Sequence, residues 1–577
     1  MNLLRAACLL LLLSGTAFAA PLKNVLAGHA SPYLAQHGAD PVAWQEWNAE
    51  TVARARREGK LLFVSVGYFA CHWCHVMQRE SYRDPAIARL LNTHFIPVKV
   101  DRELNGALDA ALIDFVERLK GVSGWPLNAF VTPEGYPAYA LMYAPPIEFR
   151  GLIERLQTTW QSRRTEFEAA AREAAGFDTP PPAAPALTAD EARRAYLQAA
   201  LQEADTLQGG FGDVSKFPLP THLRALLEIQ ARVPEPRLRD FLLLTLDQMA
   251  GQGLRDAVQG GFFRYTIDPD WQTPHFEKML YDNAQLAVVY ARAAEVLQRP
   301  AYRTIAHETL DWMLAALRLP DGSFATATSA LDARGREGGD SLWTVAMLRR
   351  VLSTAEFEAA RKAWKLDSVA PFEHGFLPRP GLGLSPALFA RLKAARPARP
   401  PRDDKRNAGL NGLALSALSR AGGDVPRFAA AARALHDFLT TRMSDGDALL
   451  RTRAGPRVFK AAELDDYAYV ATGLEDYGQR YQVPAARQQA QRLAAMAWTR
   501  FFGPAGWRQE TRPLLASVRP QASMADGALP SPAWKLLQLA VKSEKMAAQA
   551  VNASRLAASA VRHAPFDHPG AVLAGLK

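Results

Sequence analysis

The motif Cys71-His72-Trp73-Cys74-His75 constrains this chain more than any other feature, because it directly follows the apolar run at 61–67. The chain has three cysteines, and the remaining one, Cys8, lies in an N-terminal segment that we expect to be removed. A lone Cys-x-x-Cys at the end of a strand is typical of thiol–disulfide exchange, whereas a structural disulfide framework uses several pairs. The motif therefore predicts a redox site at the end of a buried strand.

The N-terminus has the pattern of a secretory signal peptide over residues 1–19. Arg5 supplies the positive charge, a short apolar segment follows, and Ala17-Phe18-Ala19 is a small-x-small cleavage site. The apolar segment is too short to span a bilayer, so an uncleaved anchor is the weaker alternative. We expect a periplasmic or secreted protein without stable membrane insertion after signal cleavage.

Length and charge narrow the class of protein further. A chain of 577 residues is long enough for two or three domains. The net charge of +10 is spread thinly, and no block of Lys and Arg contains interleaved aromatic residues. This distribution argues against a nucleic-acid partner.

The first 175 residues have the element order of a thioredoxin-like domain, which we place at 20–175. Apolar runs predict strands at 61–66, 95–100, 127–131 and 136–142, and helical periodicity predicts helices at 43–58, 75–91, 108–119 and 147–175. This order gives a βαβ unit, then a proline and a hairpin, in one mixed sheet covered by helices. Pro126 stands just before the third strand, where a thioredoxin-like site needs a cis-proline loop, so we expect the Trp125–Pro126 bond to be cis.

The position of the motif assigns roles to its residues. Cys71 precedes a helix N-terminus, where the dipole and free N–H groups stabilise a thiolate, so we assign Cys71 as the nucleophile and Cys74 as the resolving thiol. We expect protonated imidazoles of His72 and His75 to favour the thiolate further, and Trp73 to shield the disulfide or contact a partner. The strand before the motif carries no acid that could accept a proton from the resolving thiol. Glu80 and Asp101 could fill that role, although nothing in the sequence places them there.

Three other interpretations of the motif stay open. Cys-x-x-Cys-His is also the attachment motif of c-type haem, but a haem domain is helical around the motif, whereas here a strand leads into it. The two cysteines and two histidines could bind a soft metal. A passive disulfide is the weakest alternative, because so short a loop stabilises little. We expect no resident metal or cofactor.

Beyond a Pro/Ala-rich linker at 176–187, the chain is rich in Ala, Leu and Arg with helical periodicity. Polar segments that open helices recur at loose intervals, which predicts six helical hairpins in a closed (α/α)6 toroid over 188–577. An irregular helical domain is the alternative. The predicted openings are Lys216-Phe217-Pro218, Glu277 to Asp282, Ser341-Leu342-Trp343, Asn411-Gly412-Leu413, Asp465-Asp466-Tyr467 and Pro530-Ser531-Pro532.

A toroid would gather the inner ends of these hairpins around a central funnel. Carboxylates and aromatic side chains in such a funnel are typical of sugar binding or sugar chemistry. Helix capping by Asp282 and Asp465, and a core position for Tyr281, are the structural alternatives. The predicted funnel residues are Arg264, His275, Glu277, Tyr281, Asp282, Asp465, Asp466 and Tyr467.

Several long motifs make the chain resemble the spermatogenesis-associated protein 20 family. The resemblance implies a thioredoxin-like domain joined to a toroid of the six-hairpin glycosidase type, and it leaves the activity poorly defined. It covers nearly all of the expected mature chain. Its motifs are Ser31-Pro32-Tyr33-Leu34, Gln36-His37, Pro41-Val42, Trp44, Gly67-Tyr68, Cys71-His72-Trp73-Cys74-His75-Val76-Met77, Glu80-Ser81-Tyr82, Lys99-Val100-Asp101-Arg102-Glu103, Gly124-Trp125-Pro126-Leu127, Gly209-Gly210-Phe211-Gly212, Lys216-Phe217-Pro218, Pro274 to Asn283, Asp403-Asp404-Lys405 and Asp465-Asp466-Tyr467-Ala468.

The chain departs from the family pattern mainly outside the cysteine motif. Leu104-Asn105-Gly106 and the segment Met142-Tyr143-Ala144-Pro145 replace more polar family segments in the first domain. In the second domain, Gly409-Leu410 and Ser531-Pro532-Ala533 remove polar residues from the predicted funnel. These changes make a sugar reaction less expected here, while the cysteine motif is intact.

Two hypotheses of function follow. The first is an exported thiol–disulfide oxidoreductase in which Pro126 positions the partner, with protein thiols, protein disulfides or a thiol reductant as partners and the toroid as a binding unit. The second is a carbohydrate-binding or carbohydrate-processing toroid, of glycosidase or epimerase type, with the thioredoxin-like unit as an accessory. A non-catalytic redox or metal sensor is a third.

Overall fold

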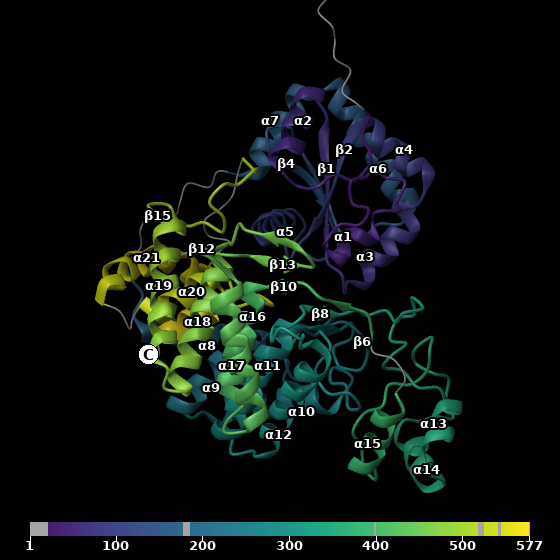
Figure 1. Ribbon diagram of the computed structural model, residues 1–577, viewed down its shortest axis with the longest axis vertical. Helices are drawn as coiled ribbons and strands as arrows, with labels where there is room; N and C mark the ends of the chain where they lie inside the picture. The colour runs from purple at the N-terminus through teal and green to yellow at the C-terminus, as the bar shows by residue number, and fades with distance from the viewer. Residues whose placement is uncertain are drawn as a thin grey trace, which may run out of the picture.

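The computed structural model describes residues 21–176, 185–396, 400–446, 448–516, 524–540 and 544–575. The predicted signal peptide and most of the predicted linker lie outside these residues. Figure 1 shows an N-terminal domain built around a sheet, next to a larger helical domain. Among the described helices, none combines the length and the apolar character needed to cross a membrane.

The N-terminal domain contains a four-stranded mixed sheet in the order β2-β1-β3-β4. Strand β1 (Leu61–Gly67) pairs in parallel with β2 (Phe95–Asp101) and antiparallel with β3 (Leu127–Val131), which pairs with β4 (Pro137–Leu141). Every residue of β1, β2 and β3 is buried, because helices cover both faces of the sheet. The helices are α1 Pro32–Gln36, α2 Ala49–Glu58, α3 His72–Met77, α4 Pro85–His94, α5 Gly106–Lys120, α6 Pro146–Ser162 and α7 Arg164–Ala175, with a π-helical turn η1 at Gln78–Tyr82.

This arrangement confirms the predicted thioredoxin-like fold but corrects three helix boundaries. Helix α2 begins six residues later than predicted, because the Asn48 side chain accepts a hydrogen bond from the backbone N–H of Thr51 at 2.9 Å and caps the helix there. The predicted helix at 75–91 starts earlier, at His72, and is broken where Asp84 caps α4 ahead of Pro85. The predicted helix at 147–175 is interrupted at Arg163.

The second domain is an all-α toroid, as predicted. Its six inner helices contact one another in a closed ring in the order α9, α11, α16, α18, α20, α22 and back to α9, and each packs on an outer partner. Gly412 and Gly473 let α16 and α18 approach closely, since a Cβ on Gly473 would stand 2.4 Å from the carbonyl oxygen of Gly412. The inner helices are α9 Pro220–Arg232, α11 Leu280–Val296, α16 Ala408–Ala421, α18 Leu464–Arg480, α20 Pro532–Ala540 and α22 Pro569–Gly575, and their outer partners are α10 Pro236–Gly251, α12 Ala301–Trp312, α17 Pro426–Arg442, α19 Pro484–Phe501, α21 Glu544–His563 and α8 Ala189–Glu203.

One of the six predicted hairpin positions is wrong. The segment Ser341-Leu342-Trp343 opens no ring helix and instead precedes an insertion of three helices, which has its own apolar core and projects away from the ring in Figure 1. Asn411-Gly412-Leu413 lies near the start of α16, as Asp465-Asp466-Tyr467 lies near the start of α18. The sixth inner helix is the short α22, which pairs with α8 from the start of the domain. The inserted helices are α13 Val345–Val351, α14 Thr354–Ala363 and α15 Pro386–Ala395.

Short strands and turns in the loops complete the toroid. The 3₁₀ turn η4 spans Pro565–Asp567 and the π-helical turn η2 spans Met313–Leu317. The strands are β5 Tyr265–Thr266, β6 Pro274–His275, β7 Lys278–Met279, β8 Ala327–Thr328, β9 Arg402–Asp403, β10 Arg406–Asn407, β11 Ser444–Asp445, β12 Ala448–Leu449, β13 Thr452–Ala454, β14 Arg457–Phe459, β15 Phe502–Gly503 and β16 Gly506–Trp507.

The two domains are joined by buried polar contacts at the end of the toroid where the inner helices begin. Lys405 is fully buried, and its ammonium group contacts the carboxylates of Asp101, Glu103 and Asp403. Arg451 of the toroid donates to the Leu104 carbonyl oxygen of the N-terminal domain at 3.0 Å. Helices α3 and α5 therefore face the toroid, as Figure 1 shows.

Candidate functional site

The two cysteines lie where β1 leads into α3 and are joined by a disulfide bond. Cys71 is the N-cap residue of α3, and its sulfur accepts a hydrogen bond from the backbone N–H of Cys74 at 3.1 Å. The same N–H would stabilise a Cys71 thiolate after reduction. Cys71 is 3% exposed and Cys74 is 1% exposed, so only a narrow approach leads to the bond.

The Tyr33 hydroxyl and the Cys74 sulfur both lie next to Gly67. A Cβ on Gly67 would stand 2.8 Å from the Cys74 sulfur and closer still to the Tyr33 hydroxyl, so both groups occupy the space that a side chain at Gly67 would need. The Tyr33 hydroxyl is buried and has no hydrogen-bond partner among the described residues. Burial raises the pKa of this phenol well above its usual value, so the hydroxyl keeps its proton and remains a donor beside the resolving cysteine.

The two histidines of the motif do not carry the positive charge that we expected. Burial lowers the pKa of His75 to about 4, and a ring nitrogen of His75 lies 2.9 Å from the Phe69 carbonyl oxygen. Burial also lowers the pKa of His72, against the opposing effect of Glu337. The prediction of protonated imidazoles is therefore wrong, because desolvation outweighs the nearby negative charge. The inward contact of His75 also argues against its use as a haem ligand.

Trp73 and Pro126 are the two further residues that the motif and the cis-proline loop contribute to the predicted thioredoxin-like site. Trp73 is 39% exposed and packs on Tyr143 with ring centroids 5.0 Å apart. The Trp125–Pro126 peptide bond is cis, which confirms the expectation. Trp125 itself donates from its indole N–H to Asp109 at 2.7 Å.

Neither acid proposed for the resolving thiol is available as a free base. The Glu80 carboxylate accepts a hydrogen bond from the Tyr143 hydroxyl at 2.6 Å, and Asp101 accepts one from the Ser31 hydroxyl at 2.6 Å and binds Lys405. At the middle of β1, Ser65 accepts a hydrogen bond from the buried Lys99 ammonium at 2.8 Å. Burial lowers the pKa of Lys99 to about 7.

Three predicted funnel residues meet the N-terminal domain directly. The Tyr68 hydroxyl donates to Glu277 at 2.8 Å, and the Arg264 guanidinium contacts the same hydroxyl and lies 5.0 Å from the Trp125 ring centroid. His275 stacks on His72 with ring centroids 5.1 Å apart and bonds to Glu337 at 2.6 Å. The toroid therefore covers the face of the N-terminal domain that carries the disulfide and the cis-proline loop.

A cavity of about 360 Å³ lies between the two domains, beside this contact. Tyr281 and Asp465, both predicted, line it together with Trp125, Asp109 and Asp526. Burial raises the pKa of Asp526 to about 7. Aromatic rings and a few carboxylates around a cavity of this size can bind a small polar molecule.

The remaining predicted funnel residues do not line the cavity. Asp282 is buried, and burial, opposed by Arg264, raises its pKa to about 8. Asp466 accepts hydrogen bonds from Arg451 at 2.7 Å and from the Gly409 backbone at 3.1 Å, so it holds the loops of the toroid together. Tyr467 packs against Phe501, away from the funnel.

The sequence does not predict that Glu337 and Tyr33 belong to the site. Glu337 lies in a loop 62 residues beyond its partner His275, without any motif around it. Tyr33 was noticed as part of a family motif, but its position beside Cys74 depends on tertiary packing. Only the fold brings these residues to the cysteines.

Three comparisons place the chain among known proteins. A family model named Thioredox_DsbH, described as "Protein of unknown function, DUF255", matches residues 23–177. Spermatogenesis-associated protein 20 of Mus musculus is 31% identical over 562 residues, which span 84% of this chain and 71% of the mouse protein. The protein of the same name from Homo sapiens is 36% identical over 356 residues, which span 57% of this chain but only 44% of the human protein.

Two solved structures are similar to parts of the chain. Cellobiose 2-epimerase from Spirochaeta thermophila covers 67% of this chain and 95% of its own length, with a TM-score of 0.42 and 14% identity. A structure titled "DsbH Oxidoreductase" covers 20% of this chain and 85% of its own length, with a TM-score of 0.17 and 17% identity.

Proposed function

Because the chain belongs to the spermatogenesis-associated protein 20 family, whose similarity extends through both domains, we propose a shared activity centred on the cysteine motif: thiol–disulfide exchange in an exported protein. One observation carries the proposal. The disulfide-bonded sulfur of Cys71 lies at the first turn of α3 and accepts the Cys74 backbone N–H at 3.1 Å. This arrangement favours a thiolate at Cys71 after reduction.

The exchange proceeds in two balanced steps. The Cys71 thiolate attacks one sulfur of a substrate disulfide, and a mixed disulfide forms while one substrate thiolate leaves. Cys74, as the thiolate, then attacks the Cys71 sulfur and releases the second substrate thiol. The substrate gains two electrons, and an external thiol reductant must reduce the Cys71–Cys74 bond for the next cycle. The same steps in reverse oxidise a substrate dithiol.

Tyr33 has a role in the second step. Its buried hydroxyl lies beside the Cys74 sulfur and lacks an acceptor among the described residues while the disulfide is intact. Reduction creates an acceptor there, and a donated hydrogen bond stabilises the Cys74 thiolate. Tyr33 thus stabilises the Cys74 thiolate by donating a hydrogen bond, rather than by accepting its proton as a carboxylate base would.

The covered position of the disulfide restricts the substrate. With Cys71 3% exposed and the toroid against the same face, a folded protein surface cannot reach the sulfur. We infer that low-molecular-weight disulfides or flexible cysteine-containing segments are the substrates. The toroid thus excludes folded proteins from the redox site and admits small or flexible disulfides.

The test compares exchange by the full chain and its serine variants. Cys71→Ser is expected to abolish the reduction of glutathione disulfide, and Cys74→Ser is expected to accumulate a mixed disulfide with glutathione that mass spectrometry detects. Full reductase activity in the double-serine variant would disprove the proposal. Equal rates with glutathione disulfide and with a rigid folded protein disulfide would disprove the restriction on substrate.

The interdomain cavity supports a second candidate function, which is the binding of a small polyhydroxyl molecule. Trp125 offers an aromatic ring and Asp465 a partly exposed carboxylate on a cavity of about 360 Å³. The residues to test are therefore Trp125 and Asp465, rather than Glu277, Asp282 and Asp466. Stabilisation by a monosaccharide or disaccharide that is lost in Asp465→Asn would support this function, and the absence of any shift across a broad sugar panel would refute it.

A further inference from the structure

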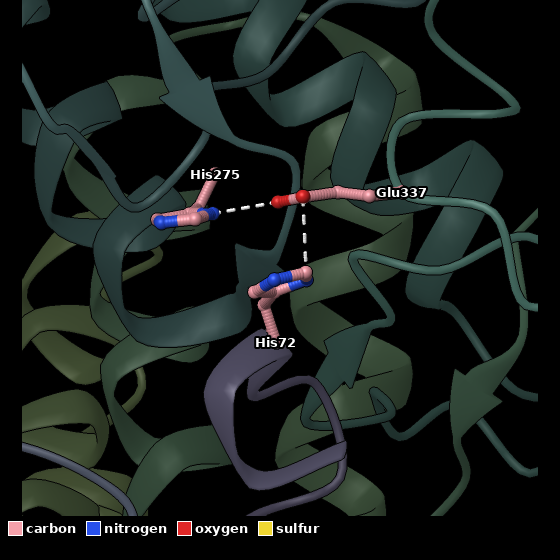
Figure 2. A group of neighbouring side chains, drawn as sticks. All are labelled: His72, His275 and Glu337. Atoms are coloured by element: carbon pink, nitrogen blue, oxygen red, sulfur yellow. Dashed lines mark hydrogen bonds and ion pairs between the residues drawn. The ribbon is translucent and has the colours of Figure 1, made fainter. Parts of the chain in front are cut away.

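Three potential metal ligands from separate segments lie close together, as Figure 2 shows. His72 is the first residue of α3, between the two cysteines. His275 ends the short strand β6, and Glu337 lies in the loop between β8 and α13, where it forms a bridge with Leu331. The cluster therefore joins the N-terminal domain to the toroid.

The geometry of the cluster brings both imidazoles to one carboxylate. The Nδ1 atom of His275 lies 2.6 Å from one Glu337 oxygen, and the Nδ1 atom of His72 lies 3.3 Å from the other. The two rings are stacked, with their planes 21° apart. One ligand atom from each residue lies within 4.8 Å of the other two.

We propose that His72, His275 and Glu337 bind a divalent metal ion of the zinc class. Two imidazoles and one carboxylate, with a further position left for water or a small ligand, form the ligand set of catalytic zinc sites. With zinc–ligand bonds of about 2.0–2.1 Å, tetrahedral ligand atoms stand roughly 3.3 Å apart. The His72–Glu337 distance of 3.3 Å already matches this spacing.

Hydrogen bonds and ion pairs alone leave one nitrogen of the cluster without a partner. The Nδ1 atom of His72 is buried and has no hydrogen-bond partner among the described residues, since its approach to Glu337 lacks hydrogen-bond geometry. A buried polar atom without a partner is costly. A metal ion between the three side chains gives this nitrogen a partner.

The ion would tie the cysteine loop to the toroid. His72 follows Cys71 directly, whereas His275 and Glu337 belong to the other domain, so metal binding would hold α3 against the toroid. The thiols are not needed as ligands, because the disulfide can stay intact. The metal site therefore does not depend on the redox activity proposed above.

The test uses the full chain without a polyhistidine tag, treated with a chelator, and with the Cys71–Cys74 disulfide kept oxidised. Titration with Zn²⁺ is expected to give one ion per chain at saturation and to raise the melting temperature. Co²⁺ in its place is expected to give visible ligand-field bands without the sulfur-to-metal charge transfer of a thiolate site.

Two variants and one control decide the outcome. His275→Ala and Glu337→Gln are expected to weaken zinc binding by at least about 100-fold, since the loss even of an outer-shell partner costs about 10–100-fold. His374→Ala, which changes a toroid histidine outside the cluster, is the matched control and is expected to retain binding. Failure of the parent chain to bind added Zn²⁺, or undiminished binding by both ligand variants, would overturn the proposal.

Discussion

Replacement of Lys405 by methionine tests whether buried charge joins the two domains. The Lys405 ammonium group is fully buried and contacts three carboxylates, with distances of 2.9 Å to Glu103 and 3.0 Å to Asp403, and a shorter contact to Asp101. Asp101 and Glu103 belong to the N-terminal domain, whereas Asp403 belongs to the toroid. The methionine side chain has a similar length, so the change removes the charge with little change in volume.

The expected loss of stability is about 3–5 kcal/mol, which is typical when one partner of a buried ion pair is removed. The structure explains why the loss is large, because three carboxylates would then face one another without a cation. Even with Lys405 present, burial raises the pKa of Asp403 to about 7. Without Lys405 the pKa of Asp403 rises further above its unfolded value, so the folded state loses stability as the pH rises. The deficit of the variant should therefore grow as the pH rises above about 7, the folded pKa of Asp403 in the parent.

Urea denaturation of the full chain measures this loss, with the first unfolding transition as the readout. Lys460→Met is the matched control, because Lys460 pairs with Asp445 at 2.9 Å but both side chains are more than half exposed. The control is expected to cost less than about 1 kcal/mol. Equal small losses in both variants, or a Lys405→Met deficit that does not depend on pH, would refute the reasoning.

Three further predictions each concern a single residue. Tyr33→Phe removes the donor beside Cys74, so the reduction potential should become about 30–60 mV more negative, because a hydrogen bond to a charged group contributes about 1.5–3 kcal/mol; an unchanged potential would contradict this role. Gly67→Ala should lower stability by about 1–3 kcal/mol in a melting experiment, since its Cβ would stand 2.8 Å from the Cys74 sulfur. Gly121→Ala is the comparison variant: its Cβ would meet open space, so it tests the strain of a positive φ alone. Asp282 has a folded pKa of about 8, above its unfolded value, so its burial costs more stability as the pH rises; Asp282→Asn should gain about 1 kcal/mol or more relative to the parent between about pH 5 and pH 8, and a gain that is the same at both pH values would contradict this.

The N-terminal domain could be predicted from the sequence because its signals are local. Apolar runs at 61–67 and 127–131 form strands β1 and β3, and the cysteine motif marks the junction between β1 and α3. The errors lie at helix ends, where single side chains decide. Asn48 starts α2 late, and Asp84 ahead of Pro85 starts a new helix.

The sequence predicts the toroid fold but not the position of every helix, because the helical repeat is irregular. The insertion at α13–α15 separates α11 from α16, and α22 is only 7 residues long, so neither feature follows the expected interval. The sequence does not predict that α22 packs on α8, since the two helices stand at the first and last positions of the domain in the sequence. The ring itself closes through the contact of α22 with α9, which also joins distant parts of the sequence.

The site could be predicted only as far as the motif itself. Tyr68 and Glu277 are 209 residues apart, and nothing in their local sequence pairs a phenol with that carboxylate. The same holds for His72 and Glu337. The histidine charge was predicted wrongly because the sequence shows the nearby residue types but not the burial that lowers the pKa.

The reduction potential of the Cys71–Cys74 pair tests the central claim most directly. The measurement uses the full chain with Cys8→Ser, so that these two residues are the only thiols, and equilibrates it with glutathione buffers before the free thiols are trapped and counted. The account predicts a reversible two-electron couple between about −120 and −270 mV, the range of thiol–disulfide oxidoreductases. A pair that stays oxidised below about −300 mV, as structural disulfides do, would contradict a role in exchange.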